Sequence, residues 1–379
     1  MHFVFVSTMA GALWGGSEEL WSQAALRLRE QGHEVSASVV WWRRPSQKTL
    51  ALAEHGVKLY SRKLQQHRPI PIRVWDQLRS RFHVDDERKK WLSTRSPDLI
   101  VVSQGGNSDG VEWMKFCQEA SLPFVSIVQC NWEAWWPPDA IGRELASAYH
   151  AAKNVFCVSR RNLELLEYQI GASLPNATVV CNPFNVPTDQ PPVWPLDNGT
   201  WKLACVARLE PAAKGQDLLF QVLSGLPWKD RVLELNLYGS GPCEDNLRRL
   251  TTRLNLNNVR FHGHVNDVRA IWEQNHLLVL PSRYEGMPLA LVEAMWCARP
   301  ALVTDIGGNA ELCVDEETSF VAAAPTVNLV GEALERAWNR RDDLENMGSL
   351  ARSRVEKLIS KDPVADFCTR LVTLAGIGK

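Results

Sequence analysis

Two glutamates in one short segment are the side chains whose type and spacing best suit chemistry. Glu285 lies in the polar turn PSRYEGM, directly after the apolar run at Leu277–Leu280. Glu293 lies about one and a half turns inside the helix predicted over Pro288–Trp296, where a carboxylate can accept hydrogen bonds from a ribose diol. Gly286 carries no side chain, so the backbone beside Glu285 can approach a ligand closely.

The start of the predicted helix adds positive character at the same place. Proline is favoured at a first helical position because its missing N–H is not needed there, so Pro288 is expected to open the helix. The free N–H groups of that first turn can hold an anion such as a diphosphate. Taken alone, the segment is equally consistent with an ordinary turn and a solvated carboxylate at Glu293.

Five segments together resemble a known family. SRYEGMPLALVEAM at Ser282–Met295 resembles the signature of family 4 (group 1) retaining glycosyltransferases, in which two glutamates are separated by seven residues. The resemblance implies the GT-B fold, an α/β architecture with two Rossmann-like, doubly wound parallel-sheet domains facing a central cleft. The other four segments follow in the family's order and are VARLEPAAKGQDLL at Val206–Leu219, LYGSGPCEDNL at Leu237–Leu247, VRFHGHV at Val259–Val265 and IGGNAEL at Ile306–Leu312.

The resemblance implies a site for a nucleotide-sugar donor. The family's basic pair falls on Arg208 and Lys214, whose charges would stabilise the departing diphosphate. In the family the first glutamate contacts the donor sugar and the second the ribose, so Glu285 and Glu293 take these roles. The other implied donor positions are the backbone of Gly286, Met287, Pro288 and Leu289, the base-facing His264 and Val265, and the Gly15–Gly16 turn near the phosphate.

The implied reaction is hexosyl transfer with retention, from a UDP- or GDP-sugar to a saccharide or lipid-linked acceptor, in polysaccharide or glycoconjugate synthesis. No Asp-x-Asp triplet follows a predicted strand, and Arg208, Lys214 and a helix terminus can supply the charge, so we expect no metal and no cofactor beyond the donor. Many relatives carry a histidine after the strand at Leu99–Ser103, whereas this chain reads VVSQGGNSDG. A catalytically weak GT-B protein that binds nucleotide sugars or carbohydrates therefore remains the alternative.

The acceptor side is expected in the first half of the chain. Gln104 and Asn107 follow a predicted strand and are polar candidates for the acceptor. Trp132 and Trp135 lie in CNWEAWWPPD, also directly after a strand, and flat aromatic faces bind sugar rings well. Aromatic packing beneath a loop is an equally good interpretation of these tryptophans.

Composition limits the partners. The chain has 42 Lys and Arg residues against 43 Asp and Glu, so no nucleic-acid partner is expected. Residues 41–95 are locally basic, with 14 Lys and Arg against 5 Asp and Glu, and they contain four tryptophans. Such a segment suits an anionic membrane surface, although a solvated basic face explains it as well. Scattered cysteines without metal spacing predict a cytosolic protein, with peripheral contact at the inner face of the membrane as an option.

Parallel sheets are needed to position these residues. Short apolar runs alternate with amphipathic stretches, which predicts strand–helix–strand units. Ligands bind such sheets at the carboxyl ends of the strands. The predicted strands are His2–Ser7, Glu34–Val40, Leu99–Ser103, Pro123–Val128, Val155–Ser159 and Thr178–Cys181 in the first half, and Lys202–Val206, Glu234–Tyr238, Val259–His262, Leu277–Leu280 and Ala301–Thr304 in the second.

A proline-rich stretch divides the chain. NPFNVPTDQPPVWPLDNG at Asn182–Gly199 contains five prolines, which cannot continue a helix or a central strand. The predicted domains are an acceptor-side Rossmann-like domain at 1–185, a linker at 186–199 and a nucleotide-sugar-binding domain at 200–355. A helical tail at 356–379 is expected to pack back on the first domain.

Overall fold

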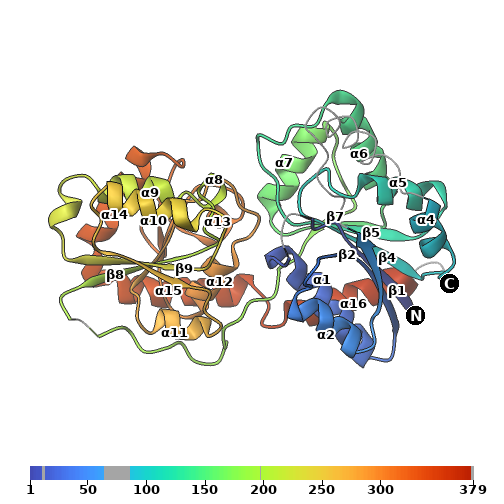
Figure 1. Ribbon diagram of the computed structural model, residues 1–379, viewed down its shortest axis with the longest axis horizontal. Helices are drawn as coiled ribbons and strands as arrows, with labels where there is room; N and C mark the ends of the chain where they lie inside the picture. The colour runs from blue at the N-terminus through green and yellow to red at the C-terminus, as the bar shows by residue number, and fades with distance from the viewer. Residues whose placement is uncertain (11–12, 64–85, 197, 377–379) are drawn as a thin grey trace. The chain divides into compact units, whose positions relative to one another are not determined.

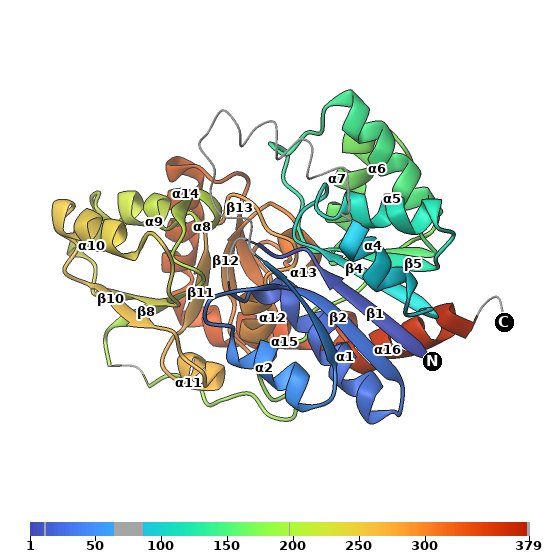
Figure 2. The same cartoon turned by 45° about the vertical axis from the view of Figure 1, so that its right-hand side comes forward.

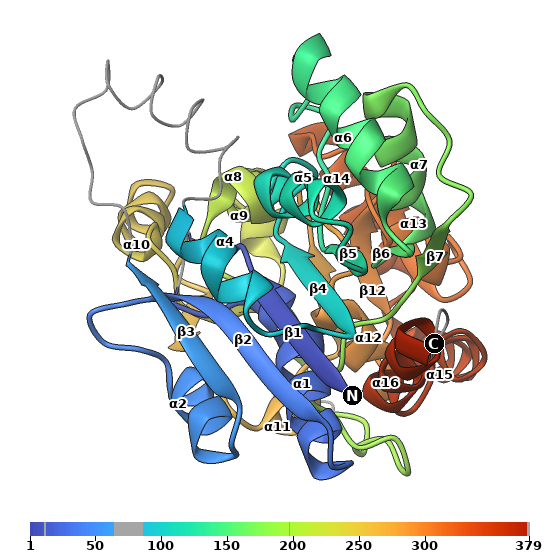
Figure 3. The same ribbon diagram turned by 90° about the vertical axis from the view of Figure 1, so that its right-hand side faces the viewer.

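In a computed structural model that describes residues 1–10, 13–63, 86–196 and 198–376, the first part of the chain forms a parallel sheet. Its strands are β1 (His2–Ser7), β2 (Glu34–Trp41), β3 (Lys58–Lys63), β4 (Leu99–Gln104), β5 (Phe124–Val128), β6 (Asn154–Cys157) and β7 (Ala177–Val179). They lie in the order β3-β2-β1-β4-β5-β6-β7, which can be followed in Figure 3. β1 and β4 are buried along their whole length, as expected for strands covered on both faces.

Helices cover both faces of this sheet (Figure 1). Phe3 and Phe5 of β1 pack with the helices of one face, and Val4 and Val6 pack with those of the other, because side chains alternate along a strand. The helices of the first face are α1 (Glu19–Glu30), α2 (Gln47–Glu54) and α16 (Pro363–Gly376), and those of the second are α4 (Asp86–Ser93), α5 (Val111–Glu119), α6 (Asp139–Ala151) and α7 (Arg160–Ile170). A short 3₁₀ helix, η1 (Gly16–Glu18), precedes α1.

The second part of the chain forms another parallel sheet. Its strands are β8 (Trp201–Val206), β9 (Leu233–Tyr238), β10 (Val259–Gly263), β11 (Leu277–Leu280), β12 (Ala301–Thr304) and β13 (Ser319–Ala322), in the order β10-β9-β8-β11-β12-β13. The Leu-rich β9 buries Leu233, Leu235 and Leu237 in one continuous core with Phe320 and Leu334. Parallel strands buried on both faces have this apolar character.

Helices also lie on both faces of the second sheet (Figure 2). One face carries α9 (Gln216–Leu223), α10 (Glu244–Arg253) and α14 (Val327–Asn339), and the other carries α11 (Val268–Trp272), α12 (Leu289–Trp296) and α15 (Leu344–Leu358). The remaining elements are α8 (Pro211–Lys214), α13 (Asn309–Leu312), η2 (Trp228–Asp230) and η3 (Arg341–Asp343).

The strand order reverses once in each sheet. In the first sheet the reversal falls between β1 and β4, and in the second it falls between β8 and β11. The loops that leave two such strands diverge to opposite faces of the sheet, so a crevice opens at the carboxyl ends of the strands. The loops after β8 and β11 are therefore where a ligand of the second sheet is expected.

The chain divides into two compact units. Unit 1 comprises Met1–Pro183 together with Asp362–Lys379, and unit 2 comprises Phe184–Lys361. The last helix returns to unit 1, where Phe367 meets Phe156 edge-on at 5.1 Å and Asp362 pairs with Arg27 at 2.5 Å. Among the described helices, none has the length and apolar character needed to span a bilayer.

Candidate active site

The loops after β8 and β11 meet through an ion pair. Lys214 Nζ lies 2.6 Å from Glu285 Oε1, and the same oxygen accepts a hydrogen bond from Ser282 Oγ at 2.8 Å. The Glu285 side chain is 7% exposed and that of Lys214 is 20% exposed. A carboxylate this buried needs such partners, because an unpaired buried charge is costly. The pair therefore holds an ammonium group at the reversal of strand order.

Close backbone approach allows this contact. Gly215, directly after Lys214, has φ +66°, and a Cβ atom there would lie 1.9 Å from the carbonyl oxygen of Pro281. The backbone N–H of Arg283 donates to the Ala213 carbonyl at 2.7 Å. The Arg283 guanidinium forms a bidentate ion pair with Asp217 at 2.7 and 2.8 Å. Glycine is thus required at position 215, and Arg283 fastens the two loops together.

Arg208 provides a second cation at the end of β8. Its guanidinium is half-exposed and lies 2.6 Å from Glu210 Oε2. The buried Gln216 amide donates to the Arg208 carbonyl oxygen at 2.9 Å, which fixes the backbone at this point. The backbone is held while the guanidinium stays accessible, so Arg208 can turn toward an anion.

The loop after β12 closes another side of the site. The N–H of Gly308 donates to the carbonyl of Gly286 at 2.7 Å, and a Cβ atom at Gly307 would lie 2.2 Å from the carbonyl oxygen of Glu285. Met287 and Pro288 are buried. Pro288 stands at the N-cap and the helix begins at Leu289, one residue later than predicted.

Glu293 is buried on α12, at 5% exposure. Its Oε1 accepts a hydrogen bond from the backbone N–H of Asn185 at 3.0 Å. Nearby, Phe184 stacks on Trp296 of the same helix with ring centroids 5.7 Å apart. The proline-rich stretch after position 183 is thus attached to α12 beside the predicted ribose carboxylate.

His264 and Val265 follow β10, at the edge of the second sheet. His264 is exposed and Val265 is half-buried. Two strands, β9 and β8, separate β10 from β11, so these residues lie further along the carboxyl edge than Glu285. The residues predicted to face the base thus lie at a different strand end from Glu285.

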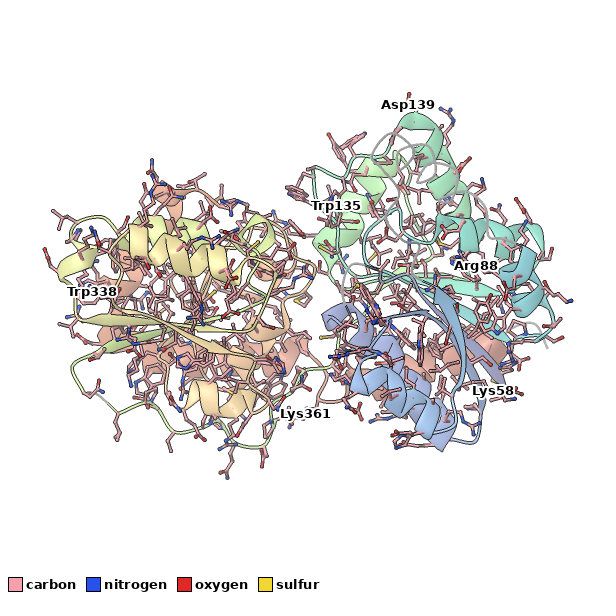
Figure 4. All side chains as sticks on the ribbon, in the orientation of Figure 1. Lys58, Arg88, Trp135, Asp139, Trp338 and Lys361 are labelled. Atoms are coloured by element: carbon pink, nitrogen blue, oxygen red, sulfur yellow. The ribbon has the colours of Figure 1, made fainter. Side chains whose placement is uncertain are left out.

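In unit 1, the predicted acceptor residues fall after β4 and β5. Gln104 and Asn107 are almost fully buried. The Gln104 amide donates to Tyr149 Oη at 3.1 Å, and that of Asn107 donates to Gln169 Oε1 at 2.7 Å. Both amides thus contact other parts of unit 1 and hold its loops. Trp135, in contrast, is 37% exposed (Figure 4).

The Gly15–Gly16 turn follows β1, which is one of the two strands at which the order of the first sheet reverses. Gly15 has an extended backbone and precedes η1, which starts at Gly16. Its position after β1 agrees with the predicted strand-to-helix turn. Part of the loop before it, residues 11–12, lies outside the described residues.

A buried carboxyl group follows this turn. Glu18 is 5% exposed, and its Oε2 accepts a hydrogen bond from Ser7 Oγ at 2.7 Å. Burial raises the pKa of Glu18 from 4.5 to about 7, although the hydrogen bond from Ser7 opposes this rise. Between those pH values the folded chain binds more protons than the unfolded chain, so stability is lost as pH rises through this window.

We expect Glu18→Gln to stabilise the protein at pH 8 by roughly 2–3 kcal/mol and to change it little at pH 5. Glutamine resembles the protonated carboxyl, keeps an acceptor for Ser7 and removes the cost of a buried charge. Thermal unfolding at both pH values measures the effect, with the exposed Glu30→Gln on α1 as the control. An equal gain at both pH values would contradict the raised pKa.

Sequence reasoning missed several residues that shape the site. Ser282 lies inside the motif quoted for its glutamates, yet no spacing rule identifies it as a partner of Glu285. Gly215 was also missed, although its place directly after Lys214 in the quoted motif is a signal that could have identified it. In the described part of the chain, no three His, Cys, Asp or Glu side chains are grouped so as to hold a metal ion.

The structure describes only part of the basic segment 41–95. Residues 64–85, Trp75 among them, lie outside the described residues. Of the rest, Trp41 at the end of β2 and Arg43 and Arg44 directly after it are exposed. The predicted membrane contact stays a prediction.

Two sheets of this order define a doubly wound α/β protein. In the second sheet, Arg208, Lys214 and Glu285 lie in the loops at the reversal of strand order, where proteins of this class bind their ligands. Residues 188–354 match the family model described as glycosyl transferases group 1. The resemblance to this family predicted from the sequence is thereby confirmed for unit 2.

Curated relatives match less than half of the chain. A poly(ribitol-phosphate) alpha-N-acetylglucosaminyltransferase of Staphylococcus aureus is 26% identical over 163 residues, 42% of this chain and 33% of that protein. An O-antigen chain mannosyltransferase C of Escherichia coli is 28% identical over 37% of this chain and 39% of its own. The matched segments thus span less than half the length of these relatives.

Solved structures match nearly the whole chain. Anabaena Alr3699/HepE in complex with UDP superposes with a TM-score of 0.75 at 17% identity, covering 98% of this chain and 100% of that one. Staphylococcus aureus TarM gives a TM-score of 0.72 at 13% identity, covering 99% and 100%. The predicted GT-B fold class is therefore confirmed.

Proposed function

We propose that the protein is a retaining glycosyltransferase that moves a hexosyl group from a UDP- or GDP-sugar to a saccharide or lipid-linked acceptor. The contact of Lys214 with Glu285 carries this proposal, together with Arg208 in the same loop after β8. It lies at the β8/β11 reversal and inside the part of the chain that matches the group 1 family. Retention is proposed from the family resemblance alone.

The charges of the site suit departure of a diphosphate. Breaking the bond between the sugar and the phosphate leaves negative charge on the nucleotide. Arg208 offers two parallel donors and Lys214 a compact charge, and both interact most strongly once that charge has developed. Glu285 keeps Lys214 in place before the donor arrives and presents a carboxylate to the sugar hydroxyls.

Ligands bound in structures of similar proteins support a UDP-sugar as the donor and a saccharide as the acceptor. Structures of the Anabaena protein contain UDP and UDP-glucose. A structure of Staphylococcus aureus TarM contains UDP, alpha-GlcNAc-glycerol and fondaparinux. Mannosyl transfer named for other relatives keeps a GDP-sugar among the candidates.

A panel of nucleotide sugars in a thermal-shift measurement tests the donor site. We expect one UDP- or GDP-sugar to raise the melting temperature, because a ligand at 100 times its Kd stabilises the native state by about 2.7 kcal/mol. In Glu293→Gln the affinity for that donor should fall about tenfold, since an amide accepts hydrogen bonds from the ribose less strongly than a carboxylate. Glutamine keeps an oxygen for the Asn185 N–H, so the fold is spared.

Glu332→Gln is the matched control, because it removes an exposed carboxylate on α14. Equal stabilisation of Glu293→Gln and the unchanged chain would remove the ribose contact from the proposal. A protein that only binds nucleotide sugars would be stabilised and yet release no free nucleotide during long incubation. Such a result would favour the binding alternative.

We also expect sugar transfer to continue at an unchanged rate after treatment with EDTA. Arg208 and Lys214 supply the positive charge that a divalent cation supplies in other transferases. The rate of nucleotide release is measured before and after dialysis against the chelator, and again with Mg²⁺ or Mn²⁺ added back. A loss of activity that either cation restores would show that the donor site uses a metal.

A further inference from the structure

Three aromatic side chains stand exposed together on unit 1. Trp135 is 37%, Trp136 56% and Tyr168 73% exposed. The tryptophans come from the segment between β5 and α6, and Tyr168 comes from α7. A single exposed aromatic is ordinary, but rings from two elements that gather at one place form a candidate binding surface.

The rings are arranged by direct contact. Trp136 and Tyr168 meet edge to face, with centroids 5.6 Å apart and planes at 89°. Trp132 and Trp135 meet in the same way at 6.0 Å and 84°. Edge-to-face contact fixes each ring against its neighbour and leaves ring faces available to a ligand. We call Trp135, Trp136 and Tyr168 the aromatic platform.

Buried amides hold the platform from below. Asn107 Nδ2 donates to the carbonyl of Trp135 at 3.2 Å and to Gln169 Oε1 at 2.7 Å. Gln169 Nε2 donates in turn to the carbonyl of Trp132 at 2.8 Å. The backbone beneath the tryptophans is thus tied to α7 and to the loop after β4. A surface held in this way loses little conformational entropy when it binds.

The platform adjoins the functional edge of the first sheet. A Cβ atom at Gly106 would lie 3.2 Å from the Trp135 ring, so this ring packs on the loop that follows β4. β4 is one of the two strands at which the order of that sheet reverses. Ligands of doubly wound sheets bind beside such loops.

Charged residues are exposed close to these aromatic residues in the sequence and on α7. Glu133 is exposed three residues before Trp136. Arg161 and Glu164 are exposed on α7, and helical spacing puts them on the same face as Tyr168. A pyranose ring has an apolar face of C–H groups, which can lie on an aromatic ring, and hydroxyls at its edge, which can bond to carboxylate and guanidinium groups. The exposed aromatic rings and the charged residues near them therefore match a pyranose ring.

We infer that the aromatic platform binds pyranose rings of the acceptor saccharide. The inference rests on the proposed glycosyltransferase function and adds the residues that recognise the acceptor. Trp136 and Tyr168 contact the sugar, while Asn107 and Gln169 are positioning residues that hold the tryptophan backbone.

Binding to an array of immobilised disaccharides to hexasaccharides tests the inference with the full chain. The saccharide retained most strongly is then titrated by calorimetry. Trp136→Ala and Tyr168→Ala should each weaken its Kd about tenfold or more, whereas Tyr168→Phe, which keeps the ring, should stay close to the unchanged protein. Trp41→Ala, which removes an exposed tryptophan at the end of β2, is the control and should bind as before.

Unchanged affinity in both alanine variants would overturn the inference, and so would an array on which the chain retains no saccharide. Melting temperatures of the variants verify that each is folded. The nucleotide-sugar thermal shift, measured on the same variants, separates the two proposals. If the nucleotide sugar still raises the melting temperature of variants that no longer bind the saccharide, the proposed function stands and only the platform is affected. If no nucleotide sugar raises the melting temperature of the unchanged chain, the result counts against the proposed function itself.

Discussion

Replacing Arg208 by alanine is expected to lower kcat for sugar transfer about 100- to 1000-fold, with the melting temperature nearly unchanged. The guanidinium is 48% exposed, and exposed ion pairs such as the one with Glu210 contribute little to stability. Its contribution to the proposed reaction should be larger, because there it would meet the diphosphate as negative charge develops. Initial rates with saturating donor, together with thermal unfolding, separate the two contributions.

Arg248→Ala is a closely matched control. Arg248 is 50% exposed and pairs with Glu244 at 2.8 Å, much as Arg208 pairs with Glu210. This variant should keep full activity. Lys214→Ala should lose both activity and stability, because it leaves the buried Glu285 without its cation. Full activity in Arg208→Ala would remove Arg208 from the proposed leaving-group site.

Gly215→Ala is expected to lower the free energy of unfolding of unit 2 by about 4 kcal/mol or more. An L-residue at φ +66° costs about 1–2 kcal/mol, and the added Cβ atom would lie 1.9 Å from the Pro281 carbonyl oxygen. That oxygen belongs to backbone, so the loops after β8 and β11 must separate. Lys214 would then move away from Glu285, and sugar transfer should fall together with stability.

Gly263→Ala separates the two causes, because Gly263 has φ +71° and no atom within 4 Å of a built Cβ. It should lose only the conformational cost of about 1–2 kcal/mol. Urea unfolding of both variants gives the comparison. Equal losses would mean that the close approach of the two loops contributes nothing to stability.

Strands buried on both faces were the part of the fold best predicted from the sequence. β11 and β12 occupy Leu277–Leu280 and Ala301–Thr304 as predicted, because continuous apolar runs mark central parallel strands. β3 was missed, since its sequence KLYSRK is polar and suits the edge of a sheet. β13 at Ser319–Ala322 was also missed, because four small and apolar residues give no distinct period.

The sequence predicted most residues of the candidate site, but few of the contacts between them. The chain motifs identified Arg208, Lys214 and the two glutamates, and the strand order brings the loops of Lys214 and Glu285 together. The bond between Glu293 and the Asn185 N–H joins residues far apart in the chain, so only packing reveals it. For the same reason, sequence could not show that Gln104 and Asn107 direct their amides to Tyr149 and Gln169.

The return of α16 to unit 1 bears on the order in which the protein is made. Unit 2 is continuous in the chain, whereas unit 1 needs a helix that leaves the ribosome only after all of unit 2. Until then, the side of unit 1 that receives Phe367 and Leu371 is uncovered, and exposed apolar surface during synthesis favours aggregation. Unit 2 can complete its fold first, so we expect chaperones to protect the uncovered side of the nascent unit 1 until α16 is made.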